Sequence, residues 1–338
     1  MLSGSNNRTV QKEIGLQFRN HLEWIKRERA QYKKVKTRAL NQPDRLLSMI
    51  IDGADQTKYQ VPHFRYKTKA SEQVPHLQVI DVTVHGVGHW VYTAFKNIAH
   101  DSNLTIECVQ RTLSEVAKYK NWDSFPPELH VQMDNCWREN KNKFLGGYLS
   151  LLVDRKVFSQ VRLSYLPVGH THEDVDQLFS TLSNKLKTAD AFTLEQLHEL
   201  MESAKTQDPR VRCTHIEDVA NISALLEKYL QPLTGISKFR YFKIYRDAEQ
   251  AVCLTTKDSV DDKAWKGSAD GRAIYLVPKG ISRVNILTQT PDYQFKAVEP
   301  LPQSLLNPWK AYIPEEDITN VSDLFERCFS RTTSKFHW

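Results

Sequence analysis

Apolar residues along the chain fall into short runs that end in acidic residues or turns. Residues 46–53 form a nearly continuous apolar run that closes on Asp52 and a glycine, which is typical of a buried central strand. Two further β-rich runs, 77–86 and 89–95, flank a short glycine turn and predict a hairpin. The first three elements of the fold are therefore expected to be consecutive strands.

Beyond the hairpin, helical periodicity alternates with strand-like runs as far as about residue 190. The predicted elements are, in chain order, helix 106–119, strand 128–135, helix 142–158, strand 161–166 and a helix that begins near residue 172. Together they give the order β-β-β-α-β-α-β-α, which describes a mixed sheet with helices on its faces. This is the element order of the ribonuclease H fold, so we predict an α/β protein with a ribonuclease-H-like sheet.

Both ends of the chain differ from this central pattern. Apolar residues at helical spacing predict one or two basic helices over residues 10–40. After residue 190, helical segments give way to short β-like runs separated by prolines and glycines. We therefore divide the chain into a basic helical segment (1–45), a ribonuclease-H-like domain (46–205), a helical connector (206–235), a small β-rich accessory module (236–310) and a tail (311–338).

The charge of the chain permits a nucleic-acid partner, DNA above all. The net charge is +6, and cationic residues crowd one N-terminal segment, 26–38. Within it, Lys33, Lys34 and Lys36 are predicted to contact phosphate groups or to form a nuclear-import signal. A solvated helix face is the alternative interpretation of the same charges.

Cysteine usage and hydropathy exclude other classes of protein. The five cysteines are scattered and form no CxxC pair, so neither a disulfide-linked partner nor a cysteine zinc site is expected. A reducing compartment, the nucleus or the cytoplasm, fits best. No apolar run is long enough to cross a bilayer, and the N-terminus lacks the apolar core of a secretion signal, so no membrane partner is expected. A homo-oligomer is left open.

Asp52 and Asp134 each stand at the expected carboxyl end of a strand, where ligands bind in open α/β sheets. Two neighbouring carboxylates repel each other unless a cation lies between them. A hard divalent ion with oxygen ligands, Mg²⁺ or Mn²⁺, resolves that conflict. Taken singly, either acid could instead cap the next helix or close a turn.

The stretch 169–176 supplies a third acidic cluster at the start of a predicted helix. The apolar stripe of that helix places Asp176 on one border of the buried face, so Asp176 is the predicted third metal ligand. Asp174 lies on the other border and is kept as an alternative ligand. Its structural alternative is a capping box with Thr171.

Polar residues follow Asp134 closely in the chain. Asn135 is a candidate for orienting phosphate or metal-bound water, Lys141 or Lys143 for a phosphate contact, and Asn142 for a further nucleic-acid contact. A polar loop that ends in a helix cap is an equally good interpretation of the same residues.

Three sequence pieces together resemble a known family. They are residues 51–56, Asp134-Asn135 followed by 140–142, and residues 169–179. In these pieces the chain resembles an uncharacterised domain family of eukaryotic transposon-derived proteins related to DDE/D transposases, over roughly residues 46–190.

The resemblance implies a ribonuclease-H-like fold and two-metal phosphoryl transfer on DNA, such as nicking, strand transfer or nuclease activity. Carried over by position, Asp52, Asp134 and Asp176 would be the metal ligands, and His170 would be an adjacent polar group that touches phosphate. The chain departs from the transposase pattern because no zinc-finger module precedes these residues.

Two alternative functions stay open. Residues 170–174 spell HxHxD, which resembles the metal-binding run of binuclear zinc hydrolases, with His198 and His215 as distant ligands. The expected next histidine of that run is Val175 here. The other alternative is a catalytically inactive, domesticated DNA- or chromatin-binding protein that keeps the fold.

Overall fold

We describe the fold from a computed structural model of the 338-residue chain. The structure describes residues 3–66, 74–134, 136, 140–165, 173–233, 235–267, 274–276, 290–296, 312–330 and 333–334. Asn135 and His170, two of the predicted site residues, lie outside the described residues, as does the β-like run at 284–287.

Helices and strands follow the predicted order β-β-β-α-β-α-β-α from β1 to α4, so the chain is a mixed α/β protein. The α-helices are α1 (Ser3–Asn41), α2 (Ser102–Lys120), α3 (Lys143–Asp154), α4 (Glu173–Leu186), α5 (Leu194–Glu202), α6 (Ile222–Glu227) and α9 (Glu315–Phe329). The strands are β1 (Leu46–Gly53), β2 (Gln78–Val84), β3 (Gly88–Ala94), β4 (Glu128–Met133), β5 (Gln160–Tyr165), β6 (Val211–His215), β7 (Tyr241–Arg246), β8 (Val252–Lys257), β9 (Tyr293–Gln294) and β10 (Thr333–Ser334).

Eight strands form one mixed sheet in the spatial order β6-β3-β2-β1-β4-β5-β7-β8, and β9 and β10 pair separately. Within the large sheet β1 is antiparallel to β2 and parallel to β4, and β5 continues the parallel part. β7 and β8 extend the sheet beyond β5 as antiparallel strands. Because β1, β4 and β5 are parallel, their carboxyl ends lie at the same edge of the sheet.

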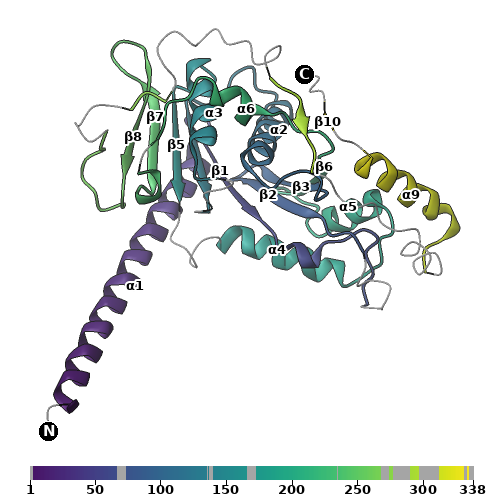
Figure 1. Ribbon diagram of the computed structural model, residues 1–338, viewed down its shortest axis with the longest axis horizontal. Coiled ribbons are helices and arrows are strands. Elements are labelled where there is room, and N and C mark those ends of the chain that lie inside the picture. Colours follow the sequence, from purple (N-terminus) through teal and green to yellow (C-terminus); the bar gives the residue numbers. More distant parts are fainter. Residues whose placement is uncertain are drawn as a thin grey trace.

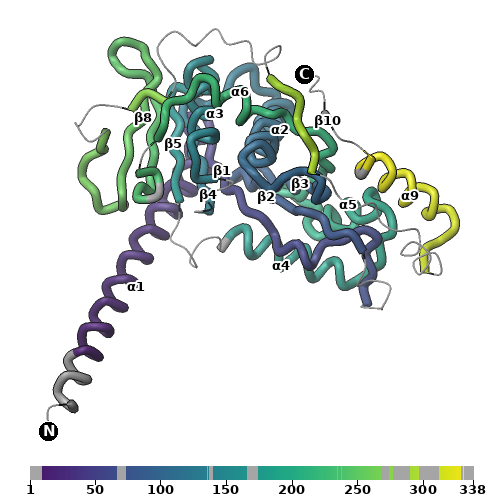
Figure 2. The backbone as a smooth tube through the Cα atoms, viewed as in Figure 1, coloured from purple at the N-terminus to yellow at the C-terminus, as the bar shows by residue number. Residues whose placement is uncertain are grey.

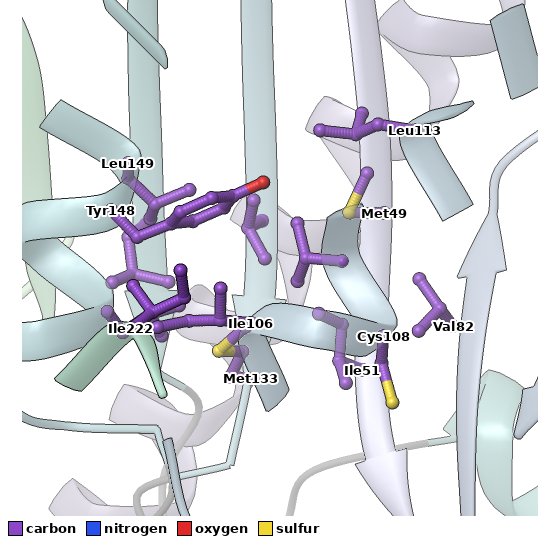
Figure 3. Packing of buried hydrophobic residues seen from close by; sticks show 14 of the residues in the cluster. Met49, Ile51, Val82, Ile106, Cys108, Leu113, Met133, Tyr148, Leu149 and Ile222 are labelled. Atoms are coloured by element: carbon purple, nitrogen blue, oxygen red, sulfur yellow. The ribbon is translucent and has the colours of Figure 1, made fainter. Parts of the chain in front are cut away.

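One face of the sheet packs against α2, α3 and α6 and carries the larger apolar core. Successive side chains of a strand point to opposite faces, so alternate strand residues lie on this side. Met49, Ile51, Val82 and Met133 are among them, and they gather with helix residues such as Leu149 (Figure 3). All five side chains are almost completely buried.

The opposite face packs against α4, α5 and α9, and its apolar core is smaller. Leu178 and Leu182, on the stripe predicted for α4, are buried there with Val79 and Val91. The strand residues on this face also include a row of buried polar side chains: Ser48, Asp81, Thr83, His89, Thr93, His130, Gln132 and Ser164. We call this side of the sheet the polar face.

The basic N-terminal residues form one long helix, α1, which extends away from the body of the molecule (Figures 1 and 2). Its second half is attached to the sheet and to the β8 side of the molecule by two sets of hydrogen bonds, besides the contact of Tyr32 and Lys36 with Asp174 of α4. Arg38 donates two hydrogen bonds, of 2.8 and 2.9 Å, to the carboxylate of Glu128 at the start of β4. Glu28 is fully buried and accepts from the backbone N–H of Val260 at 3.0 Å and from the hydroxyl of Ser259 at 3.2 Å.

Three parts of the fold differ from the sequence-based expectation. The runs near 241–245 and 251–254, expected in a separate module, form β7 and β8 and continue the main sheet. Alternation predicts a strand but does not say which strand it pairs with. β6 was not predicted because this edge strand buries only Val211 fully, and α9 was not predicted in the weakly patterned tail.

Two further expectations concern membrane-spanning helices and disulfide bonds. In the described ranges, no helix is both long enough and apolar enough to span a membrane. None of the cysteines takes part in a disulfide there either.

Candidate functional site

Asp52 and Asp134 lie side by side at the ends of two parallel strands. Ile51 of β1 pairs with Met133 of β4, and both of these residues face the apolar core. The acids that follow them therefore belong to the polar face. Neighbouring strands lie about 4.8 Å apart, so the two carboxylates can reach one cation. The structure thus brings the first two predicted ligands together.

Hydrogen bonds hold both carboxylates. The backbone N–H of Gly53 donates to Oδ1 of Asp52 at 2.9 Å. The side-chain amide of Asn140 donates to Oδ1 of Asp134. Asn140 is buried, and its backbone carbonyl accepts from the hydroxyl of Tyr165 at 2.6 Å. Asn140 therefore positions the Asp134 carboxylate from a fixed place; the sequence had indicated it only as part of the 140–142 piece, without a role of its own.

A third acid, Asp81 of β2, lies beside Asp52 and was not predicted. The two residues are direct partners in the antiparallel pairing of β1 and β2. Asp81 is fully buried, and its Oδ1 has no hydrogen-bond partner within the described residues. Burial raises the pKa of the Asp81 carboxyl to about 8, and the charge of Asp52 adds to the rise. The only signal in the sequence was a weak one: Asp81 is the one charged residue of the strand-like run 77–84.

A chain of hydrogen bonds leads from Asp81 along the polar face. The hydroxyl of Thr83 donates to Oδ2 of Asp81 at 2.5 Å, and its oxygen lies 2.6 Å from Nδ1 of His89. Nζ of Lys205 lies 3.0 Å from Nε2 of His89. An ammonium group can only donate, so Nε2 is the acceptor and Nδ1 carries the proton that Thr83 accepts. Burial, together with the charge of Lys205, lowers the pKa of His89 to about 4, so this ring is neutral near pH 7.

Asp174 and Asp176 lie on α4 in different surroundings. Oδ2 of Asp174 accepts from the hydroxyl of Tyr32 at 2.6 Å and from the ammonium of Lys36 at 2.7 Å, and it lies 3.7 Å from Nε2 of His85. The imidazole of His85, ahead of Lys36 and Tyr32, holds the pKa of Asp174 well below its usual range. Asp176 is exposed to solvent.

The first turn of α4 lies near the start of β1 rather than its end. Nδ1 of His85, which is close to Asp174, lies 3.0 Å from the hydroxyl of Ser48. Ser48 precedes Asp52 by four residues, or roughly 13 Å of extended strand. In the part of the chain that the structure describes, no three His, Cys, Asp or Glu side chains are grouped so as to hold a metal ion. The structure therefore does not add Asp176 to the pair of strand-end acids.

Two predicted nucleic-acid contacts lie in the loop before α3. Asn142 caps that helix, because its Oδ1 accepts from the backbone N–H groups of Phe144 and Leu145. Lys141 is almost completely buried, and burial together with the charge of Arg240 lowers its pKa to about 8. Its ammonium lies 5.3 Å from the centre of the Tyr165 ring.

The predicted phosphate-contacting lysines of the basic segment lie on α1. Lys33 and Lys34 are exposed, whereas Lys36 is half-buried against Asp174. The basic segment therefore has two lysines on its solvent side and one that joins α1 to α4.

The residues of the alternative zinc site are only partly described. His170 and His172 lie outside the described residues. His198 and His215 do come together, because the hydroxyl oxygen of Thr93 lies 2.9 Å from a ring nitrogen of each. Burial lowers their pKa values to about 4 and about 3. They form a neutral hydrogen-bonded group beside the edge strand β6.

A cavity of about 400 Å³ opens on the polar face, beside the turn between β2 and β3. α1, this turn, α4 and the segment before β6 surround it. Its charged and hydrogen-bonding lining includes Lys36, Thr83, His85, His89, Asp174 and Lys205. Gly86 in the turn has φ of +76°, and a Cβ there would lie 2.7 Å from the side chain of Leu40. Glycine therefore allows α1 to close on this turn.

Fold and site together define a mixed α/β protein with paired acids at the ends of its central parallel strands. The chain belongs to the family described as a domain of unknown function (DUF7869), whose model matches residues 67–262, more than half of the chain. No curated protein matches it significantly. The family match includes Asp134 and α4 but begins after β1, so Asp52 precedes it.

Proposed function

We propose that this protein is a metal-dependent enzyme that cleaves or transfers phosphodiester bonds of DNA, with Asp52 and Asp134 as ligands of Mg²⁺ or Mn²⁺. The observation that carries the proposal is that these two acids directly follow the paired residues Ile51 of β1 and Met133 of β4. Mg²⁺ is usually held in proteins by one or two carboxylates, with water and substrate phosphates completing its shell. Two oxygen-donor side chains at one sheet edge fit that requirement.

The strand arrangement supports the ribonuclease-H-like fold that the resemblance to transposon-derived proteins implies. β1 has an antiparallel hairpin on one side and two parallel strands on the other. In this proposal β1 to β5 and α2 to α4 form the ribonuclease-H-like unit. β6 and the β7–β8 pair then widen its sheet at opposite edges.

The residues around the acids have roles that follow from their contacts. A divalent ion, when bound, supplies Lewis-acid stabilisation of charge on the phosphoryl oxygens. Asn140 fixes the orientation of Asp134 through its side-chain amide. Lys141 keeps its charge at pH 7 because its pKa of about 8 lies above neutrality, but its side chain is almost completely buried, so it would have to leave the Tyr165 ring to donate to a phosphate oxygen.

Asp176 is our proposed third ligand. Its exposed side chain makes no hydrogen bond with the described residues, so no interaction there has to be broken, but α4 would have to shift along β1 for Asp176 to reach a cation at the strand ends. Asp174, the alternative ligand, would first have to leave Tyr32 and Lys36. Breaking charge-assisted hydrogen bonds of this kind costs roughly 1.5–3 kcal/mol each, which favours Asp176.

The test is cleavage of plasmid DNA and of single-stranded RNA by the purified full chain, with Mg²⁺, with Mn²⁺ and with a chelator. We expect metal-dependent cleavage of DNA that is lost in Asp52→Asn and in Asp134→Asn and is reduced in Asp176→Asn. Asp123→Asn, which changes an exposed acid in the loop before β4, is the matched control and should cleave normally. Cleavage that survives Asp134→Asn, or no metal-dependent cleavage at all, rejects the proposal.

DNA binding without catalysis is the second candidate function. The observation that favours it is the lack, within the described ranges, of a three-residue metal-ligating group. In that case the chain shifts DNA in a gel, Lys33→Gln combined with Lys34→Gln weakens the shift, and no variant or wild-type sample cleaves. Retardation of DNA together with cleavage that needs Asp134 argues against this second candidate.

A further inference from the structure

The cavity beside the β2–β3 turn contains an ammonium group that forms no ion pair with a carboxylate of the described residues. Lys205 makes no ion pair with any described residue, and one of its three N–H groups is directed to His89. The other cation of the cavity, Lys36, is paired with the carboxylate of Asp174. The lining therefore carries one positive charge in excess.

The imidazoles of the cavity leave that excess unchanged. Burial lowers the pKa of His85, and burial with the charge of Lys205 lowers that of His89, so both rings are neutral near pH 7. They add hydrogen-bonding capacity without adding charge. A ligand that balances the cavity must therefore be an anion.

Lys205 is held in place before any ligand arrives. Its anchor, His89, is fixed by Thr83, which is fixed in turn by the fully buried Asp81. A lysine side chain normally loses much rotational freedom on binding, and that loss opposes affinity. Because this chain of hydrogen bonds already orients the ammonium group of Lys205, its side chain loses less rotational freedom when a ligand binds.

We propose that this cavity binds a phosphate-bearing ligand, whose phosphoryl oxygens accept hydrogen bonds from the ammonium groups of Lys205 and Lys36. The volume of about 400 Å³ lies within the range of small-molecule sites. A phosphoryl group has three oxygens that accept strong hydrogen bonds, and lysine is a common point-charge partner for it. The ligand can be a nucleotide-sized molecule or the terminal phosphate of a nucleic-acid strand, since both present the same group.

This site is separate from the strand-end acids. The cavity adjoins the β2–β3 turn, where His85 lies against Ser48 at the beginning of β1, whereas Asp52 ends that strand. The inference therefore stands without the phosphodiester chemistry proposed above, and each can fail alone.

The experiment measures binding to the purified full chain by calorimetry, with a chelator present so that no divalent metal contributes. The probes are inorganic phosphate, adenosine monophosphate and a 5′-phosphorylated single-stranded oligonucleotide with its unphosphorylated counterpart. We expect binding that Lys205→Met, which keeps the aliphatic stem, weakens by at least about tenfold. Lys187→Met, an exposed lysine near the other end of α4 and outside the cavity, is the matched control and should bind as wild type.

Binding of inorganic phosphate and the mononucleotide identifies a small-molecule site, whereas binding only of the phosphorylated strand identifies a nucleic-acid end. Asp134→Asn should leave either result unchanged, which separates this site from the proposed metal site. No binding of any probe, or equal binding by wild type and Lys205→Met, overturns the proposal. Thermal unfolding of the Lys205→Met protein at the wild-type temperature excludes misfolding as the cause of a loss.

Discussion

The two faces of the sheet are built from the same strands but differ in chemistry. On the α2–α3 side, β1 and β4 contribute Met49, Ile51, Val131 and Met133 to a continuous apolar core. On the α4 side the same strands contribute the buried hydroxyl, imidazole and amide groups of Ser48, His130 and Gln132, and β2 adds the buried carboxyl of Asp81. Burying apolar surface stabilises the fold, whereas burying a polar group costs free energy unless it is hydrogen-bonded. The buried polar groups of the polar face do not maximise the stability of the fold, so we expect them to serve function.

The largest expected effect concerns the polar face. Asp134→Asn should lower metal-dependent cleavage by more than the roughly 10- to 100-fold that loss of an outer-shell partner usually costs. The free energy of unfolding should stay close to wild type, because the amide keeps the shape of the side chain. Cleavage rates and urea unfolding of the same preparation check both parts. A large loss of stability together with unchanged cleavage would show that Asp134 supports the fold rather than metal-dependent cleavage.

Truncation on the apolar face should have the opposite signature. Leu149→Ala removes a fully buried side chain of α3 from the larger apolar core. It should destabilise the fold by about 2–5 kcal/mol. Leu16→Ala, at an exposed position of α1, should change stability by less than about 0.5 kcal/mol. Chemical denaturation of the two variants provides the comparison, and equal effects would show that the apolar face is not the main core.

Asn140→Ala should have an intermediate effect. It removes the amide that holds Asp134 but leaves both acids, so metal affinity should fall by roughly 10- to 100-fold rather than vanish. Asn140→Asp tests the geometry further, because it adds charge and cannot donate the same hydrogen bond at neutral pH. Calorimetric titration with Mn²⁺ measures the change; unaltered affinity in Asn140→Ala would mean that Asp134 needs no such support.

Acid should destabilise the polar face before it affects the apolar one. Burial, with the charge of Arg162, lowers the pKa of His130 to about 3, and its Nε2 lies 2.7 Å from the hydroxyl of Ser164. A histidine whose folded-state pKa lies below its unfolded value of about 6.5 contributes stability above that value and loses it as the pH falls toward 3.

Between pH 6.5 and 5.5, His130 alone should therefore cost about 1 kcal/mol of unfolding free energy. His130→Gln keeps a donor for Ser164 without a titratable ring, so its stability should fall less steeply over the same interval. Urea unfolding at half-unit pH steps measures the slope. Identical slopes in both proteins would show that His130 does not titrate in this way.

The smallest effect is expected where α1 meets the sheet. Arg38 and Glu128 form a two-point ion pair with side chains 39% and 26% exposed. Exposed pairs of this kind contribute up to about 1 kcal/mol, so Arg38→Ala should lower stability by no more than that. A larger loss in thermal unfolding would make α1 an integral part of the fold rather than an attached helix.

Sequence patterns predicted the parts of this molecule that local chemistry determines. The run ending at Asp52, the glycine-linked hairpin and the strand before Asp134 were all found, because apolar periodicity marks buried strands directly. The pairing of β7 with β5 could not be predicted from sequence patterns, because strand pairing depends on contacts between residues far apart in sequence. α9 was missed although Glu315, Glu316 and Asp317 in its first turn are a recognised helix-start signal.

The candidate site shows the same limit. Two strand-end acids could be placed from sequence, since the ends of neighbouring parallel strands meet at one edge. Asp81 was overlooked because a single acid inside an apolar strand becomes meaningful only when the register sets it beside Asp52. The position of α4 along β1 could not be predicted either, because helix packing along a sheet is set by tertiary contacts such as that of Asp174 with Lys36.

The most direct test of the central claim is a crystal structure with Mn²⁺ and data collected at the manganese absorption edge. The account predicts an anomalous peak within coordination distance, about 2–2.5 Å, of carboxylate oxygens of both Asp52 and Asp134, and its disappearance in Asp134→Asn. No peak at saturating Mn²⁺, or a peak that neither acid touches, would contradict the assignment of these two aspartates as a metal site.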